Sequence, residues 1–368
     1  MALRGGALED LVTTMQQQFW TGRRVLVTGH SGFKGGWLAL WLARLGARVH
    51  GYALAPPTTP SLYRAARVGE RLAGEHIADL RDRAALAAAF DAAAPEVVFH
   101  LAAQPLVRAA YRDPVETYAV NLMGTVDLLE TVRQHPGVRA VVVVTSDKCY
   151  ENHDWVWPYR EDDALGGHDP YSSSKACAEL VSASYRRAFL EEAGTALATV
   201  RAGNVIGGGD WAAERLVPDV LRAIDAGEPV VLRAPGAIRP WQHVLEPLAG
   251  YLDLAERLCA DNGEYIGAWN FGPEAADARP VRWLVEWLCT AVPGAQWRLD
   301  ERPQPREATV LRLDSSKARA ALGWRPRWPL EQALARTLDW HRAWRAGEDM
   351  QTRTLAQIAD YTATEPPR

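Results

Sequence analysis

Three glycines, each separated from the next by two residues, constrain the start of this chain. Gly29, Gly32 and Gly35 directly follow the apolar run 25–27 and precede apolar residues at helical spacing. In a strand–turn–helix, the first glycine permits a tight turn, the second lets the backbone approach a pyrophosphate, and the third lets the helix pack closely. The free N–H groups at the N-terminus of the helix favour an anion. The layout therefore predicts a dinucleotide phosphate site.

Apolar runs alternate with helical patterns over the first 200 residues. We expect strands at 25–27, 48–54, 75–80, 96–103, 138–145 and 195–201. Between them we expect helices that include 37–45, 83–94, 116–134 and 170–192. The nearly continuous apolar run of the fifth strand is typical of a parallel strand buried on both faces. The predicted fold class is α/β, a Rossmann-type doubly wound parallel sheet with a smaller α/β C-terminal substrate domain.

The same pattern suggests a domain organisation. We expect residues 1–18 to form an N-terminal tail, 19–201 the dinucleotide-binding domain, and 202–362 mainly the substrate-binding domain. Segments of 228–272, namely a strand at 230–232, a helix at 248–258 and a strand at 268–271, are expected to rejoin the first domain.

Composition excludes several classes of partner. The formal net charge of -4 over 368 residues leaves no polybasic stripe, so we expect neither nucleic acid nor a membrane as a partner. Long apolar runs and a signal-peptide pattern are missing from the sequence, so we expect a cytoplasmic protein. The four cysteines and nine histidines never stand at metal-ligand spacing, so no metal site is predicted.

Tyr171 and Lys175 form the second informative pattern. Asp169 can cap a helix and Pro170 suits its first position, which sets Tyr171 and Lys175 one turn apart on one face. A nearby ammonium favours the phenolate, so the tyrosine is expected to act as a base with a lowered pKa. The alternative is a surface pair without a role in catalysis.

A third pattern ends the fifth predicted strand. Thr145, Ser146, Asp147 and Lys148 stand at the carboxyl end, where ligands bind in open α/β sheets. The Ser146 hydroxyl would bond a substrate oxygen, and the adjacent acid and amine indicate further proton transfers. The alternative for Asp147 and Lys148 is an ion pair that caps the strand.

Six segments carry a resemblance to a known family. They are VLVTGHSGFKG (25–35), HLAAQP (100–105), TSDKCY (145–150), DPYSSSK (169–175), RAGNVIGGGDW (201–211) and RPWQHV (239–244). On these motifs the chain resembles the nucleotide-sugar 4,6-dehydratases of the extended short-chain dehydrogenase/reductase family, and within them the branch that acts on CDP-D-glucose. The resemblance covers the chain from about residue 19 to 362.

The resemblance implies a redox-neutral mechanism. Tyr171, assisted by Lys175 and Ser146, would remove the proton of the glucose 4-hydroxyl while the C4 hydride leaves for NAD. Asp147 matches the acid that protonates the departing C6 hydroxyl. Lys148 stands where the dTDP-glucose enzymes have Glu, so an amine would remove the C5 proton. Return of the hydride to C6 would give a 4-keto-6-deoxy sugar.

The resemblance also implies NAD as the cofactor. Tyr52 stands where many NAD enzymes carry an acid for the ribose, and His30 and Lys34 would favour a 2′-phosphate, so NADP is the less expected alternative. The expected cofactor-binding residues are Gly29, Gly32, Phe33, Lys34, Gly35, Tyr52, Asp79, Leu80, Leu101, Ala102, Ala103, Asn121, Thr145, Tyr171 and Lys175.

The expected substrate is CDP-glucose or a related sugar nucleotide. The family's substrate positions correspond to Gln104, Asn204, Arg239, Trp241, His243 and Asn270. Arg215 and Arg306 are candidates for the diphosphate because a guanidinium matches phosphate oxygens, although a single arginine is more often a solvated surface charge. Trp211 and Trp241 are the tryptophans expected near the ligand.

Two other functions stay open. A sugar-nucleotide 4-epimerase of the same fold would share Tyr171 and Lys175 without needing Asp147 and Lys148. A non-catalytic NAD-binding sensor is the alternative from another class. We also expect a homodimer or a dimer of dimers through the helices 116–134 and 171–192, whose apolar faces would otherwise only cover the sheet.

Overall fold

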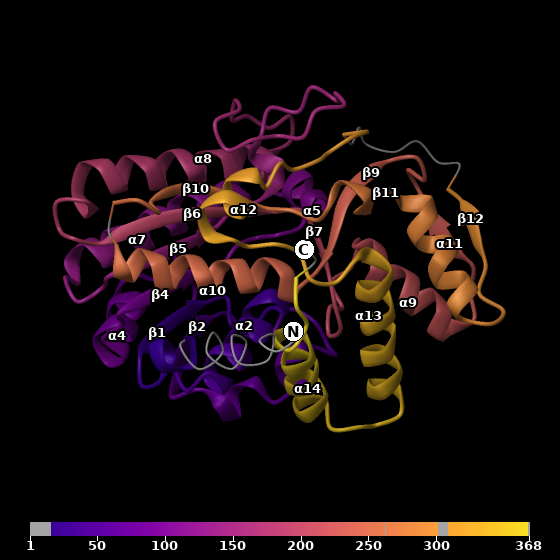
Figure 1. The fold of residues 1–368 in the computed structure, drawn as a ribbon, viewed down its shortest axis with the longest axis horizontal. Coiled ribbons are helices and arrows are strands. Elements are labelled where there is room, and N and C mark those ends of the chain that lie inside the picture. Colours follow the sequence, from indigo (N-terminus) through magenta and orange to yellow (C-terminus); the bar gives the residue numbers. More distant parts are fainter. Residues whose placement is uncertain (1–15, 262, 301–307, 367–368) are drawn as a thin grey trace, which may run out of the picture.

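Parallel strands form the central sheet of the protein (Figure 1). The structure is a computed structural model that describes residues 16–261, 263–300 and 308–366. The seven strands follow the order β10-β6-β5-β4-β1-β2-β3, and the order reverses between β1 and β4. Their bounds are β1 (Arg24–Thr28), β2 (Arg48–Ala53), β3 (Gly74–Ile77), β4 (Val97–His100), β5 (Ala140–Val144), β6 (Ala196–Ala202) and β10 (Gly267–Phe271). The predicted Rossmann-type doubly wound sheet is confirmed.

Side chains of the central strands alternate between two apolar cores. In β5, Val142 and Val144 pack into one core, whereas Val141 and Val143 pack into the other. This alternation explains why the strand is apolar throughout: both of its faces are covered. The first core lies against α2 (Phe33–Arg44), α10 (Leu245–Ala260), α12 (Ser316–Leu322) and α14 (Met350–Thr362). The second lies against α4 (Arg83–Ala93) and α7 (Gly124–Gln134).

Two long helices contain a π-helical segment. The helix expected at 116–134 consists of α6 (Pro114–Tyr118), a π-helical stretch Ala119–Met123, and α7. The helix expected at 170–192 consists of α8 (Pro170–Tyr185) and a π-helical stretch Arg186–Leu190. Such single widened turns occur often at functional sites.

The part beyond residue 203 carries two small sheets (Figure 1). One contains β7 (Asn204–Ile206), β9 (Ile238–His243) and β11 (Ala278–Pro280), and the other pairs β8 (Val230–Leu232) with β12 (Trp297–Leu299). Their helices are α9 (Leu216–Ala226), α11 (Val281–Ala291) and α13 (Leu330–Arg345). Thus β10 and α10 join the central sheet, whereas β8 lies outside it. The domain boundaries themselves stay a prediction.

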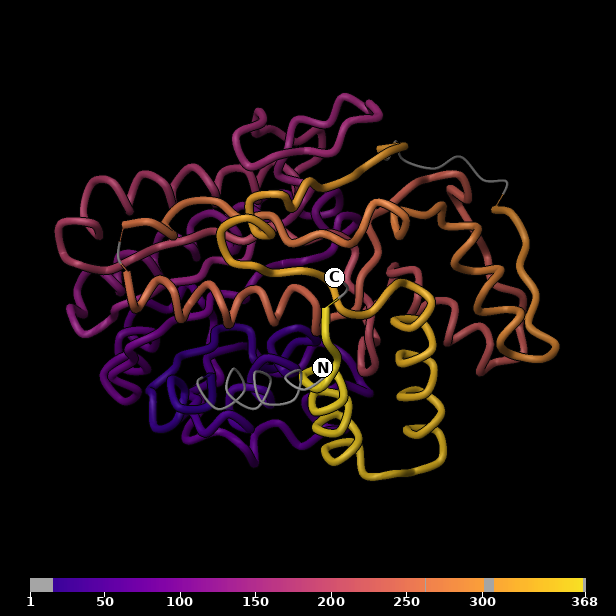
Figure 2. Tube along the Cα trace, viewed as in Figure 1, coloured from indigo at the N-terminus to yellow at the C-terminus, as the bar shows by residue number. Residues whose placement is uncertain are grey.

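Short elements complete the chain, whose course Figure 2 traces from indigo at the N-terminus to yellow at the C-terminus. They are the helices α3 (Leu62–Ala65) and α5 (Val107–Arg112), and the 3₁₀ turns Val68–Arg71, Asp147–Cys149 and Ala275–Asp277. Residues 16–20 are helical, and the buried Trp20 indole donates a hydrogen bond to Glu256 at 2.7 Å. The remainder of the expected N-terminal tail, 1–15, lies outside the described residues.

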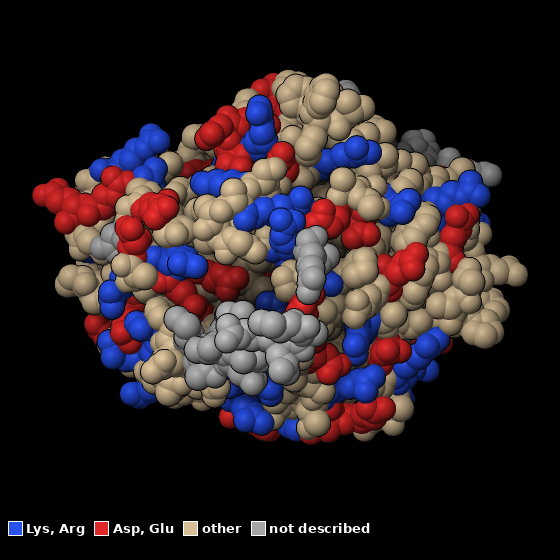
Figure 3. Space-filling view, viewed as in Figure 1, with Lys and Arg blue, Asp and Glu red and all other residues tan. Residues whose placement is uncertain are grey.

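Basic and acidic side chains are interspersed on the face that Figure 3 shows, in keeping with 41 Lys and Arg against 45 Asp and Glu. Across the three described ranges, none of the helices is both long and apolar enough to cross a membrane. The His, Cys, Asp and Glu side chains of these ranges likewise form no group of three that could hold a metal ion.

Candidate active site

The glycine turn joins β1 to α2 at the carboxyl edge of the sheet. Gly29 has a φ of +78°, and a Cβ at this position would lie 2.7 Å from Ala102 N, in the segment after β4. A Cβ on Gly35 would lie 2.1 Å from the Gly29 carbonyl oxygen. Gly32 caps α2 without a side-chain hydrogen bond, so the first N–H groups of the helix can receive an anion. The turn therefore has the form of a phosphate cradle.

The end of β2 lies beside the segment that follows β3. Tyr52 is buried, and its hydroxyl donates a hydrogen bond to the Asp79 carbonyl at 2.6 Å. The Asp79 carboxylate is held by Arg81, with 2.7 Å between Oδ2 and Nη2. Leu80 packs so closely under Gly124 that a Cβ there would lie 2.6 Å from its Cδ2. Burial raises the pKa of Tyr52 to about 12, so this phenol stays neutral.

The two basic side chains of the glycine turn have different neighbours. His30 pairs with Glu75, with 3.0 Å between Nε2 and Oε2. Lys34 instead interacts electrostatically with Asp147 and Lys175, and burial lowers its pKa to about 8. Lys34 therefore belongs to the same charge cluster as the predicted proton-transfer residues.

Tyr171 and Lys175 lie on one face of α8, and Asp169 caps this helix as expected. Both side chains are buried, and the Lys175 ammonium donates a hydrogen bond to the Val144 carbonyl at 3.2 Å. Burial raises the pKa of Tyr171 to about 12, and a hydrogen bond between Tyr171 and Ser146 opposes the rise. Burial also lowers the pKa of Lys175 to about 8. The expected lowering of the tyrosine pKa is therefore wrong for the protein alone, because desolvation outweighs the favourable contacts.

Ser146 connects the acid to the tyrosine. Its hydroxyl caps the 3₁₀ turn after β5 by accepting from Lys148 N at 3.2 Å, and it donates to Asp147 Oδ1 at 3.1 Å. Asp147 is 3% exposed, and its Oδ2 has no hydrogen-bond partner among the described residues. Burial raises the pKa of Asp147, although Lys148 and Arg239 oppose the rise. A raised pKa favours the protonated form of the carboxyl, which is the form that can act as an acid.

Two arginines bring positive charge to this pocket. Arg215, at the start of α9, pairs with Asp210 at 2.9 Å, and its charge acts on Tyr171. Arg239 on β9 is 6% exposed, and its charge acts on Asp147. Both guanidinium groups therefore lie near the predicted catalytic residues, where a diphosphate could be held.

Three other predicted residues have distinct positions. Thr145 follows β5, and its hydroxyl donates a hydrogen bond to Glu179. Asn204 is partly buried at the start of β7, in register with Trp241 of β9. Arg306 lies outside the described residues.

Two aromatic residues expected at the substrate are packed in the interior. The Trp241 indole is 3% exposed and donates to the Arg279 carbonyl at 3.0 Å. The His243 ring is fully buried between Trp37 and Trp328, and burial lowers its pKa to about 3. The geometry therefore favours a packing role for both, and contact with a substrate stays a prediction.

Three predicted amides are engaged by the protein itself. Gln104 donates to Thr117 Oγ1 at 2.9 Å, and Asn121 donates to the Gln104 carbonyl at 3.0 Å, which fastens the segment after β4 to the α6–α7 helix. Asn270 on β10 accepts from the Tyr150 hydroxyl at 2.7 Å. These contacts favour a supporting role, and direct ligand binding by these amides stays a prediction.

The buried ion pair between Glu179 and Arg201 was not predicted from the sequence. The pair joins α8 to β6 with 2.8 Å between Oε2 and Nη2, and its two side chains are 4% and 3% exposed. The only signals were the position of Glu179, four residues after Lys175, and the position of Arg201 at the start of a motif.

Comparisons with known proteins identify the family of the chain. The family model described as GDP-mannose 4,6 dehydratase matches residues 26–337. A CDP-glucose 4,6-dehydratase of Salmonella typhimurium is 52% identical over 353 residues, which cover 94% of this chain and 98% of the relative.

Two solved structures have the same fold. A Thermus thermophilus UDP-glucose 4-epimerase in complex with NAD is 26% identical, with a TM-score of 0.72 over 87% of this chain and 99% of that one. A Bacillus anthracis dTDP-glucose 4,6-dehydratase in complex with NAD is 19% identical, with a TM-score of 0.74 over 90% of this chain and 100% of that one. With the family model spanning most of its length, the chain belongs to the GDP-mannose 4,6-dehydratase family of nucleotide-sugar enzymes.

Proposed function

We propose that the protein is a CDP-D-glucose 4,6-dehydratase that forms CDP-4-keto-6-deoxy-D-glucose and water. One observation carries this proposal: the Ser146 hydroxyl contacts both Asp147 and Tyr171. Asp147 is a buried acid with a raised pKa, and it interacts with Lys34 of the glycine turn. An epimerase needs the tyrosine but not the acid. The 52% identity to a CDP-glucose 4,6-dehydratase supports the same choice and the cytidine nucleotide.

The cofactor proposed is NAD. The glycine turn fits its pyrophosphate, since Gly29 and Gly35 leave no room for a Cβ and the first N–H groups of α2 have no side-chain cap. NAD in the structure of the 26% identical epimerase supports this class of cofactor. NAD is favoured over NADP because His30 is paired with the Glu75 carboxylate, which would repel a 2′-phosphate, and Lys34 interacts with Asp147. When bound, NAD would supply the hydride acceptor for the oxidation at C4 and the hydride donor for C6.

Tyr171 is the proposed base for oxidation at C4. Its phenolate takes the proton of the C4 hydroxyl as the C4–H bond breaks and the C4=O bond forms, while Ser146 bonds the same oxygen. Because burial raises the pKa of Tyr171 to about 12, this phenolate needs positive charge. Arg215 supplies such charge on the protein side, and Lys175 lies one turn from Tyr171 on α8.

Asp147 and Lys148 are the proposed acid and base of the elimination. The new ketone acidifies the C5 hydrogen, and the Lys148 amine takes this proton as Asp147 gives its own proton to the C6 hydroxyl. The C6–O bond breaks, water leaves, and a C5=C6 double bond forms. Hydride addition at C6 and return of the proton from Lys148 to C5 give the 4-keto-6-deoxy sugar.

Arg215 and Arg239 are the proposed diphosphate partners. The charge of Arg215 acts on Tyr171, and the charge of Arg239 acts on Asp147, so both guanidinium groups lie near the proposed catalytic residues. A guanidinium presents two parallel N–H donors to phosphate oxygens, which would hold the sugar over the acid and the base.

A panel of nucleoside-diphosphate glucoses tests the function directly. The purified protein is incubated with CDP-, dTDP-, UDP- and GDP-glucose, the 4-keto product is followed by its absorbance in alkali, and the cofactor released on denaturation is identified. We expect the 4-keto product from CDP-glucose and release of NAD. Interconversion of hexose isomers without a ketone would indicate an epimerase, and binding of NAD without turnover would indicate a sensor.

We also propose a homodimer in which α6–α7 and α8 of two copies pair. Large apolar side chains are exposed on or next to these helices, namely Tyr111, Val115, Met123, Leu180 and Phe189. Light scattering on the eluting protein measures the mass. Replacing Leu180, which is 60% exposed, by Glu should yield monomers if this face pairs.

A further inference from the structure

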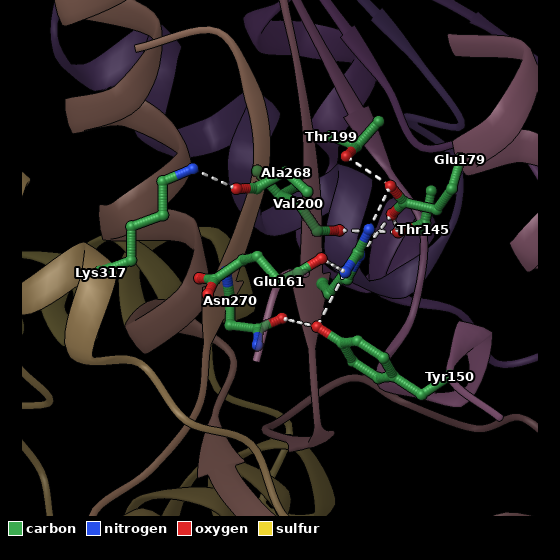
Figure 4. A network of polar contacts seen from close by, with 10 residues as sticks. Thr145, Tyr150, Glu161, Glu179, Thr199, Val200, Ala268, Asn270 and Lys317 are labelled. Carbon is green, nitrogen blue, oxygen red and sulfur yellow. Dashed lines mark hydrogen bonds and ion pairs between the residues drawn. The ribbon is translucent and has the colours of Figure 1, made fainter. Parts of the chain in front are cut away.

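Glu179 accepts an unusually complete set of hydrogen bonds for a buried carboxylate. Its Oε1 accepts from the Thr145 hydroxyl and from Arg201 Nε at 2.9 Å. Its Oε2 accepts from the Thr199 hydroxyl at 2.7 Å and from Arg201 Nη2 at 2.8 Å (Figure 4). Both oxygens are therefore satisfied by directional contacts from β6 and from Thr145, which follows β5 and precedes the catalytic turn.

Arg201 extends the network to the other side of the same turn. Its Nη1 donates to the Tyr150 hydroxyl at 2.9 Å and to the Glu161 carbonyl at 2.9 Å. The Tyr150 hydroxyl in turn donates to Asn270 Oδ1 at 2.7 Å, which fixes it to β10 (Figure 4). The guanidinium also lies 4.9 Å from the centre of the Tyr150 ring.

The network thus holds the proton-transfer residues 146–148 at both ends. Thr145, just before them, bonds to Glu179, and Tyr150, two residues after them, bonds to Arg201. Glu179 also lies one turn beyond Lys175 on α8, the helix that carries Tyr171. One ion pair therefore connects both halves of the catalytic apparatus.

Stability alone does not account for this pair. Burying two charges costs about as much free energy as their attraction returns, and apolar replacements of buried ion pairs are often neutral or stabilising. What an apolar pair could not supply is the fixed direction of six hydrogen bonds. Two of them join the pair, and the other four run to Thr145, Tyr150, Glu161 and Thr199.

We propose that Glu179 and Arg201 form a positioning unit that holds residues 146–148 in register with Tyr171 and Lys175. The inference rests on the proposed function of the site. A shift of the turn by a fraction of an ångström would move Asp147 and Lys148 away from C6 and C5 of the sugar, whereas the glycine turn that binds the cofactor would stay in place.

The pair also affects the charge of Lys175. Burial lowers the pKa of Lys175 to about 8, and the Glu179 carboxylate is the main opposing influence. Without Glu179 the ammonium would lose its proton at lower pH, and Tyr171 would lose a cationic neighbour.

Two matched variants separate positioning from packing. Tyr150→Phe removes the hydroxyl that links the pair to the turn, and Thr199→Val removes a hydroxyl that links it only to β6. Both residues are buried, at 1% and 4% exposed, so similar losses in melting temperature are expected. We expect Tyr150→Phe to lower kcat by about tenfold with little change in KM, and Thr199→Val to stay within about twofold of the wild type. Equal losses of kcat in the two variants would overturn the inference.

The dependence of kcat on pH gives a second measurement, which a loss of packing alone would not shift. In Glu179→Gln, the alkaline limb of kcat should shift to lower pH, because the Lys175 proton is held less tightly. Thr199→Val should keep the wild-type limb, and an unmoved limb in Glu179→Gln would contradict the role of its charge. Wild-type protein that makes no ketone from CDP-glucose would instead contradict the proposed function. The comparison of Tyr150→Phe with Thr199→Val does not require Glu179→Gln to fold.

Discussion

The Ser146 hydroxyl donates a hydrogen bond to the Asp147 carboxylate, with 3.1 Å between Oγ and Oδ1, while the same hydroxyl contacts Tyr171. In the proposed reaction, Tyr171 gains a proton from the C4 hydroxyl and Asp147 loses one to the departing water. Each turnover therefore leaves a proton on the tyrosine that the acid needs. Ser146 bridges these two groups and offers a path through the protein for the return.

Replacing Ser146 by Ala should impair turnover more than binding. The variant loses the bond to the C4 oxygen and the bridge between Tyr171 and Asp147, so we expect kcat to fall by about 10²- to 10³-fold with a small change in KM. Steady-state kinetics with CDP-glucose measure both constants. Ser146→Thr retains the hydroxyl and should keep much of the activity; an alanine variant as active as the threonine variant would contradict the bridge.

Replacing Lys148 by Ala should stop the reaction between its two halves. NAD would still bind and C4 would still be oxidised, so reduced nicotinamide should accumulate in a single turnover without the 6-deoxy product. Lys148→Arg is the informative control, because guanidinium keeps the charge but does not act as a base in proteins. If the arginine variant turns over normally, the side chain contributes charge and not proton transfer.

Neighbouring glycines of α2 should respond very differently to alanine. In Gly35→Ala, the new Cβ would lie 2.1 Å from the Gly29 carbonyl oxygen, so the phosphate turn must open and NAD should be lost. In Gly36→Ala, the nearest atom is the Leu62 Cδ2 at 2.9 Å, the end of a side chain that can rotate. The better helix propensity of Ala, worth about 1 kcal/mol, offsets that contact. Cofactor content after purification measures the difference, and equal retention in both variants would contradict the cradle.

The central sheet could be predicted because a parallel strand that is buried on both faces appears in the sequence as a continuous apolar run. β5 is such a run, since Val141 and Val142 enter opposite cores. The glycine turn and the Tyr171–Lys175 pair were predictable because their geometry depends on spacing along one element. The small sheets were not, since β8 and β12 pair across more than 60 residues and each spans three residues.

The site was predicted less completely than the sheet, because the sequence does not show in which direction a side chain points. His243 belongs to a motif that resembles a substrate loop, but an imidazole also packs well between two indoles, and only the fold decides between these uses. Lys34 was expected at the cofactor phosphate, and its interaction with Asp147 depends on how α2 is oriented against β5. The Glu179–Arg201 pair joins residues 22 positions apart on different elements, so spacing alone could not reveal it.

A buried carboxyl on α10 predicts how stability changes with pH. Glu246 is fully buried, and it accepts hydrogen bonds from Trp328 N at 2.8 Å, Arg327 N at 3.0 Å and the Tyr361 hydroxyl at 2.6 Å. It thereby fastens the C-terminal segment to the central core. Burial raises its pKa from 4.5 to about 7, despite these donors.

Because the folded state holds the Glu246 proton more tightly than the unfolded chain does, this group stabilises the fold fully below pH 4.5 and loses that contribution as the pH rises to about 7. The loss is on the order of 3 kcal/mol. Chemical denaturation at several pH values should show the decline, and Glu246→Gln should flatten it. The variant should also be less stable throughout, since its amide nitrogen would meet an N–H donor. Glu331→Gln, at an exposed site on α13, should keep the wild-type slope, and an unchanged slope in Glu246→Gln would assign the decline to other groups.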